Sequence, residues 1–161
     1  MIYHSIDEIL AANEAALESF QPAVTGLSAA QESFRPAADR WSIAEIVEHV
    51  ALVNRNFLRL VTQLHQQALA QGAGPAPPIA QPQLLAVADP HRERRVEAPE
   101  RVLPQGGQAV ADSLRSMEET GRGFREIQPQ LEAIDLTGAT FAHRLGELNA
   151  LQWMVLLGEH Q

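Results

Sequence analysis

The sequence contains neither lysine nor cysteine, and the two absences exclude several kinds of chemistry. All twelve basic residues are arginine, so the chain has no lysine for a Schiff base or for a phosphate-binding P-loop. Without cysteine it has no thiol nucleophile, no thiolate ligand for zinc and no disulfide. A chain without disulfides suits a reducing compartment, and we expect a cytoplasmic protein.

Basic charge is also scarce. The twelve arginines are outnumbered by twenty acidic residues, and the net charge is -8 at pH 7. A nucleic-acid-binding protein needs a basic stripe that neutralises phosphates, so we expect no nucleic-acid partner. No apolar run is long enough to span a membrane, and the N-terminus lacks a basic segment followed by an apolar run. We therefore expect neither a membrane partner nor a signal peptide.

Length and composition fit one domain over residues 1–161, because 45% hydrophobic and 20% charged residues are ordinary globular values. Two segments of the form S-x-x-E are typical of helix starts, since the serine and the glutamate can each satisfy a backbone N–H of the other. The first predicts a helix over residues 5–30, interrupted at Pro22 or Gly26. The second predicts a long helix over residues 42–70.

A proline-rich segment separates this long helix from the rest of the chain. Seven of the ten prolines fall in it, at positions 75, 77, 78, 82, 90, 99 and 104. Proline removes a helix hydrogen bond, so residues 72–107 are predicted to be a long crossover. A crossover of this length allows the helices on its two sides to run parallel.

Two further helices are expected after the crossover. The first covers residues 108–127 and is ended by Pro129. A polar loop then leads to Asn149, which begins the last helix in a capping box with Gln152. The fold class is therefore expected to be all-α, a four-helix bundle with up-down-down-up order and a long crossover between its second and third helices.

Two histidines share the same sequence context. His49 ends W-S-I-A-E-I-V-E-H in residues 41–49, and His160 ends N-A-L-Q-W-M-V-L-L-G-E-H in residues 149–160. Each follows a tryptophan by about two turns of an amphipathic helix. Imidazoles on two packed helices can converge on one metal ion. We take both as candidate metal ligands, the alternative for each being a half-buried histidine bonded to a neighbour.

The segments W-S-x-x-E-x-x-E-H and L-N-x-x-Q-W resemble those of the DinB-like superfamily, the damage-inducible proteins and their thiol-transferase relatives, over nearly the whole chain. The resemblance implies the same bundle topology and a divalent metal held by three histidines, one on the second helix and two, spaced i and i+4, on the last. His49 matches the first and His160 the second, and the third position would fall beyond Gln161. The last helix also carries no stop signal, so we expect the chain to be truncated at its C-terminus.

The resemblance further implies a metal-dependent enzyme. In relatives, bound zinc or nickel brings a small thiol such as bacillithiol or mycothiol toward an electrophile, and water on the same ion would make the protein a hydrolase instead. Two imidazoles are fewer ligands than a catalytic zinc site usually has, so we expect weak or absent metal binding in this chain. The alternative is a non-catalytic helical module for dimerisation or ligand binding with an incomplete metal site. Bundles of this kind commonly pair, so a homodimer is expected.

Several other polar residues have a functional and a simpler interpretation. Glu45 and Glu48 could orient His49, although Glu45 already has a capping role. An arginine cluster in the crossover either receives the carboxylates of an anionic cosubstrate or is a solvated loop. It comprises Arg92, Arg94, Arg95 and Arg101. The remaining histidines are expected on the surface or in loops, at positions 4, 65, 91 and 143, and both tryptophans are expected to pack in or near the core.

Overall fold

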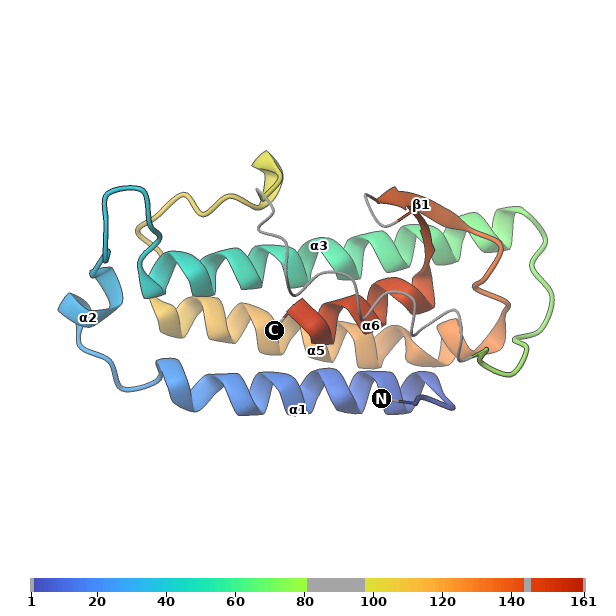
Figure 1. Cartoon of the computed structure of the whole chain (residues 1–161). Coiled ribbons are helices and arrows are strands. Elements are labelled where there is room, and N and C mark those ends of the chain that lie inside the picture. Colours follow the sequence, from blue (N-terminus) through green and yellow to red (C-terminus); the bar gives the residue numbers. More distant parts are fainter. Residues whose placement is uncertain (1, 81–97, 144–145, 161) are drawn as a thin grey trace.

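The computed structural model describes residues 2–80, 98–143 and 146–160, and it is mainly helical with one small sheet. The elements are α1 (Ile6–Val24), α2 (Ala29–Ser33), α3 (Ile43–Ala70), the 3-10 turn η1 (Glu100–Val102), α5 (Val110–Ala133), β1 (Thr140–His143), β2 (Gly146–Asn149) and α6 (Ala150–His160). The helices α1, α3 and α5 lie lengthwise beside one another, with the shorter α6 packed against α3 and α1 (Figure 1). The colours of Figure 1 show α3 and α5 running in one direction and α1 and α6 in the other. Within the described ranges, no helix has the length and apolar character needed to cross a bilayer.

Two helix starts form as expected. Ser42 Oγ accepts the Glu45 N–H at 3.3 Å, and the Glu45 carboxylate accepts the Ser42 N–H at 2.9 Å. Asn149 and Gln152 exchange the same pair of bonds, at 2.9 and 3.1 Å. The long helix also ends at Ala70, as predicted. These predictions hold because capping depends on residues only three positions apart.

The first helix is shorter than predicted. It passes through Pro22 and ends at Val24, and Gly26 follows with a φ of +78°, a conformation that glycine adopts without a Cβ clash. The following residues form the separate helix α2, which starts with its own capping box at Ser28. The predicted interruption at Gly26 is therefore confirmed, and only the extent of the helical segment differs, because residues 29–33 form a separate helix and not a continuation of α1. At the other end Ser5 accepts the Glu8 N–H as expected, but the Glu8 carboxylate accepts the N–H of His4 in place of that of Ser5, so half of the predicted capping box forms.

The prediction that Pro129 ends the third long helix was also wrong. The helix α5 continues to Ala133, with Leu131 only 1% exposed. Burying a leucine side chain stabilises the fold by about 1.5–3 kcal/mol. That is comparable to the roughly 3 kcal/mol that an interior proline costs. Packing of the last turn therefore offsets the lost hydrogen bond.

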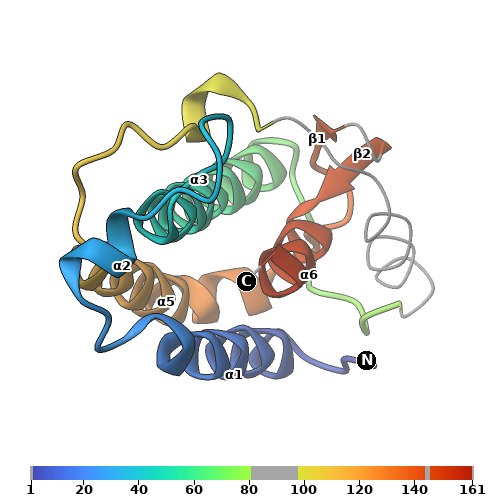
Figure 2. The same cartoon turned by 60° about the vertical axis from the view of Figure 1, so that its left-hand side comes forward.

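The expected polar loop before the last helix contains a β-hairpin, so the chain is mainly but not entirely helical. β1 and β2 pair antiparallel, with Thr140 opposite Asn149 and His143 opposite Gly146. The hairpin is tied to the next helix because Trp153 Nε1 donates to the Leu148 carbonyl at 3.2 Å. It lies over the end of α3 on the same side as η1 (Figure 2).

The main core is built from the helices α1, α3, α5 and α6. Ile9 of α1, Leu64 of α3, Phe124 of α5 and Met154 of α6 are each at most 2% exposed. Trp153 completes this core with only 2% exposure, as expected for a packing residue. The core thus holds the short helix α6 in a fixed place against its longer neighbours.

A close approach between α1 and α6 sets the position of the last helix. Asn13 is buried, and its Nδ2 donates to the Met154 carbonyl at 3.0 Å. Gly158 passes so near that a Cβ built on it would lie 2.4 Å from Asn13 Oδ1. A side chain at this position, two residues before His160, would have to displace the Asn13 amide from its bond to the Met154 carbonyl.

We predict that Gly158→Ala destabilises the protein by about 1 kcal/mol. Overpacking costs roughly 1–3 kcal/mol, and the higher helix propensity of alanine returns at most about 1 kcal/mol. Gly121→Ala is the matched control, because its added Cβ would meet no atom within 4 Å, and it should raise stability by up to about 1 kcal/mol. Chemical denaturation of both variants gives the free energies of unfolding. Equal gains in stability would show that the contact with Asn13 does not constrain α6.

Candidate functional site

The structure brings the two candidate histidines together. The ring centroids of His49 on α3 and His160 on α6 are 5.3 Å apart, with an angle of 53° between the ring planes. His49 is half-buried and His160 is exposed. The two residues meet because α6 packs against α3, and the contact joins positions more than a hundred residues apart in the chain.

The orientation of the His49 ring is set by a backbone carbonyl. His49 Nδ1 lies 2.7 Å from the carbonyl oxygen of Val102, the last residue of η1. A carbonyl can only accept, so Nδ1 carries the proton and a neutral ring has its lone pair on Nε2. Histidines that bind metals usually donate their second nitrogen to a carbonyl or carboxylate in this way. The bond therefore selects the tautomer that a metal ligand needs.

Glu48 holds the segment that follows this carbonyl. The side chain is 5% exposed, and its two carboxylate oxygens accept the backbone N–H groups of Gln105 and Gly106, each at 3.0 Å. A buried carboxylate would be costly without such donors. Glu48 thus fastens the end of the crossover to α3, close in sequence to Val102.

Glu45 has the capping role that its position predicts. Hydrogen bonding from the Ser42 backbone N–H is the main cause that holds the pKa of the Glu45 carboxyl below its usual value, and Arg35 pairs with the same carboxylate. In the described structure neither Glu45 nor Glu48 bonds to His49, whose ring is bonded to Val102. The direct orienting role considered for these carboxylates is therefore not the one observed, and Glu48 acts on His49 only through the backbone.

Aromatic rings flank the two histidines differently. The Trp41 ring centroid lies 5.0 Å from that of His49, so this tryptophan forms a half-buried wall beside the histidine pair. Trp153 lies in the core, with Phe57 at 5.0 Å and His143 at 5.1 Å between centroids. His143 therefore packs on the core tryptophan from the hairpin.

The other histidines take different positions. His4 is exposed, as expected, whereas His65 is 9% exposed and lies in the core face of α3. The surface expectation for His65 was wrong, and its spacing four residues after the buried Val61 is the signal that could have placed it. His91 lies outside the described residues. In the part of the chain that the structure describes, no group of three or more His, Cys, Asp or Glu side chains is arranged to hold a metal ion.

A groove of about 520 Å³ lies along the side of α3 that faces η1 and β1. It is lined by Leu52, Arg55, Asn56, Arg59, Leu60, Gln63, Arg101 and Phe141. Of the predicted arginine cluster, Arg101 is here, while the positions of Arg92, Arg94 and Arg95 lie outside the described residues. Sequence reasoning missed Arg55 and Arg59, although their spacing of four residues on a helix puts them on one face.

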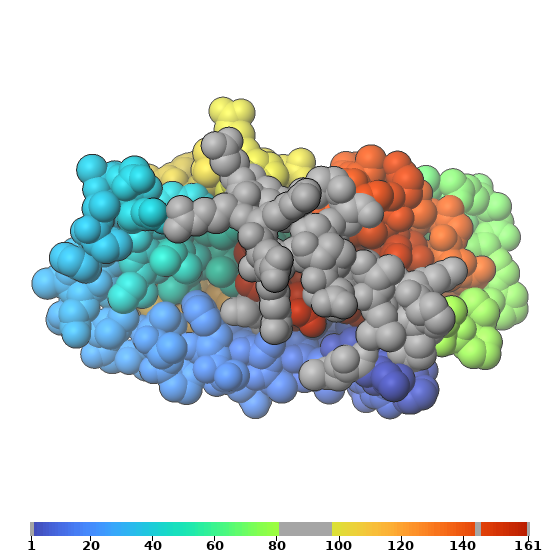
Figure 3. Space-filling view, viewed as in Figure 1, coloured from blue at the N-terminus to red at the C-terminus, as the bar shows by residue number. Residues whose placement is uncertain are grey.

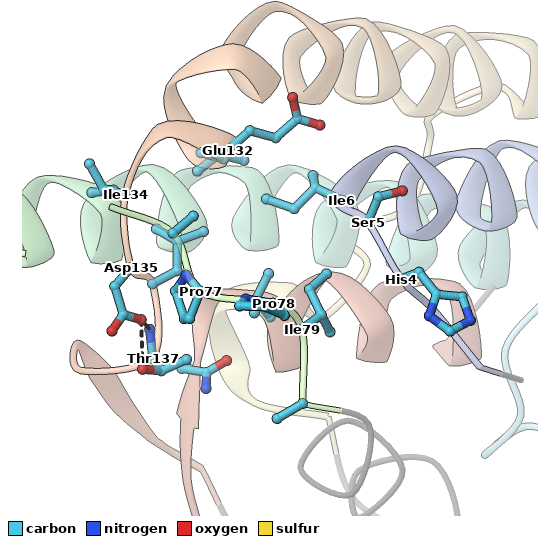
Figure 4. Close-up of a pocket in the computed structure, with 16 residues that line it drawn as sticks. His4, Ser5, Ile6, Pro77, Pro78, Ile79, Glu132, Ile134, Asp135 and Thr137 are labelled. Carbon is cyan, nitrogen blue, oxygen red and sulfur yellow. Dashed lines mark hydrogen bonds between the residues drawn. The ribbon is translucent and has the colours of Figure 1, made fainter. Parts of the chain in front are cut away.

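A second cavity, of about 410 Å³, lies near the N-terminus of α1 and is mostly apolar (Figure 4). Pro77, Pro78 and Ile79 form one wall. One of its two acidic residues, Asp135, is already engaged, because the carboxylate accepts the Thr137 N–H at 2.8 Å and the Thr137 hydroxyl at 2.6 Å. These bonds hold the pKa of Asp135 below its usual value. Asp135 therefore holds the local backbone and is not prepared for acid–base chemistry.

A model of the DinB superfamily matches residues 12–161. No curated protein matches the chain. The matched region includes both histidines, the Glu48 contacts and the groove.

We predict that Glu48→Gln loosens the His49 site. One of the two backbone N–H groups then faces an amide N–H in place of a carboxylate oxygen, which costs about 1–3 kcal/mol of stability. NMR of the imidazole nitrogens should show the Nδ1–H form of His49 mixing with the other tautomer. Glu119→Gln on the exposed face of α5 is the control and should leave both properties unchanged. A His49 ring that keeps a single tautomer in Glu48→Gln would contradict the role assigned to Glu48.

Proposed function

The chain belongs to the DinB superfamily, and on that basis we propose that it binds a divalent metal ion, zinc or nickel, through His49 and His160 and joins a small thiol to an electrophile. We also infer that its four long helices form an up-down-down-up bundle. The helix directions in Figure 1 and the packing of α1 and α3 against both α5 and α6 support this topology.

The spacing of the two imidazoles is the observation that carries the metal proposal. With Zn–N bonds of about 2.0–2.1 Å, the centroid of a ligating imidazole lies about 3.2 Å from the ion. Two such rings at a tetrahedral angle have centroids about 5 Å apart. The observed separation of 5.3 Å fits this value. The Val102 carbonyl bond adds support because it leaves the Nε2 lone pair of His49 available.

The residues around the pair suit a reaction with an external thiol. A bound divalent cation lowers the pKa of a thiol, and the thiolate is the nucleophile. Because the substrate brings the sulfur, a chain without cysteine can support the reaction. The Trp41 ring beside His49 shields one side of the pair from water. Two protein ligands leave coordination positions open but also make the expected affinity low.

A non-catalytic ligand-binding module is the competing function. It is favoured by the observation that the described residues form no three-membered group of metal donors. The two functions differ in what they require of His49: the enzyme needs it as a ligand, whereas the module needs it only as a packed side chain bonded to Val102.

We predict that untagged protein binds Zn²⁺ or Ni²⁺ and that His49→Ala and His160→Ala each weaken this binding by at least about tenfold, since each removes one of two ligands. Isothermal titration calorimetry measures the affinities. His4→Ala is the control, because this exposed histidine lies at the other cavity, and it should bind metal normally.

The same preparations test the reaction. With added metal, the wild-type protein should consume a small thiol in the presence of an alkylating electrophile, and His49→Ala should not. Metal affinities that are equal in His4→Ala and His49→Ala would overturn the metal proposal. Normal metal binding without thiol consumption, across several thiols, would favour the binding module.

A further inference from the structure

We propose that the groove between α3, η1 and β1 binds the anionic part of a small molecule that carries two or more carboxylate or phosphate groups. This rests on the proposed function, since it assigns the groove to the substrate of the histidine pair. Three arginines from two elements line it: Arg55 and Arg59 on α3 and Arg101 on η1. Among the residues that the structure describes, no acidic side chain lines it.

The arginines of the groove differ from most others in the structure. Among the arginines that the structure describes, four form ion pairs with carboxylates, namely Arg35, Arg40, Arg115 and Arg125. No ion pair within the described residues involves Arg55, Arg59, Arg101 or Arg122. Three of these last four line one groove, in a chain whose net charge is -8. The groove thus concentrates positive charge that no carboxylate within residues 2–80, 98–143 and 146–160 pairs with.

The arrangement of these charges favours a ligand with more than one anionic group. Arg55 and Arg59 are four residues apart on α3, where like charges repel and an intervening anion relieves the repulsion. Each planar guanidinium can hold a carboxylate or phosphate through two parallel bonds. Arg101 supplies a third such group from the facing element η1. A singly charged ion would satisfy only part of this set.

The remaining lining residues are those of a small-molecule site. Asn56 and Gln63 offer neutral hydrogen-bonding groups, and Leu52 and Leu60 provide apolar surface on α3. Phe141, on the hairpin, is 38% exposed and lies edge-on to Trp153 with 6.4 Å between ring centroids, so it adds an aromatic surface to the groove. The groove thus offers neutral polar and apolar contacts beside its three guanidinium groups.

The groove leads to the histidine pair. Leu52 follows His49 by three residues and Asn56 follows it by seven, so both lie on the same side of α3, with Asn56 about 10 Å away along the axis. At η1, Arg101 directly precedes Val102, whose carbonyl orients the His49 ring. Anionic groups held by the arginines would therefore direct the rest of the molecule toward His49. In Figures 1 and 3 the segment around η1 and the hairpin rise on the same side of α3.

Citrate and pyrophosphate serve as probes of the groove, and acetate is the singly charged control. Calorimetric titration of the metal-free protein should show binding of citrate or pyrophosphate but not acetate, and the tighter of the two distinguishes carboxylate from phosphate recognition. We expect Arg101→Gln to weaken this binding by about threefold and the double variant Arg55→Gln, Arg59→Gln by about tenfold. Arg122→Gln removes the same charge outside the groove and should bind the probes like the wild type.

The proposal is overturned if Arg122→Gln weakens binding of the probes as much as Arg101→Gln does, or if neither citrate nor pyrophosphate binds. All of these arginines are exposed, so circular dichroism should show the variants folded. His49→Ala separates this proposal from the metal proposal. It should leave binding of the probes to the metal-free protein unchanged. Probe binding by a protein that binds no metal would overturn the metal proposal alone. Metal binding by a protein that binds no probe would overturn the groove proposal alone.

Discussion

The packing of α6 against α1 is the constraint on which the candidate site depends. Asn13 is held by the Met154 carbonyl, and Gly158 leaves just enough room for its amide oxygen. Because the contact has no space for a Cβ, it fixes how far α6 lies from α1 and hence where its last turn meets α3. His160 follows Gly158 by two residues, so its approach to His49 is a consequence of this contact. A helix of eleven residues would be only marginally stable in isolation, so both the stability and the position of α6 depend on its packing against the core.

The candidate site also depends on the backbone at the end of the crossover, around Val102. The Val102 carbonyl, held near α3 by the bonds of Glu48 to the following loop, decides which nitrogen of His49 carries the proton. Glu48 is buried and would be costly without its two N–H partners, so the loop and the carboxylate stabilise each other. The same segment presents Arg101 to the groove. One stretch of irregular chain thus links the orientation of the histidine to the positive charge beside it.

The structure shows which kinds of prediction from sequence succeed. The helix starts at Ser42 and Asn149 were predicted because a capping box needs only residues three positions apart. The continuation of α5 past Pro129 was not, since burial of Leu131 outweighs a local signal to stop. The hairpin was missed because its strands have four residues each, too few for a clear alternation of polar and apolar positions. His65 was misplaced because its residue type was weighted above its position on the apolar stripe.

By itself the sequence determined the helix starts at Ser42 and Asn149, the apolar face of α3, the membership in the DinB superfamily and the two candidate histidines. Each of these can be recognised from residues that lie close together in the sequence. Only the tertiary structure decided that these histidines meet, that a backbone carbonyl orients one of them and that three arginines share a groove. The reason is the distance along the chain. The His49 bond spans 53 positions and the Asn13 bond 141, and such contacts form only when packing brings remote segments together.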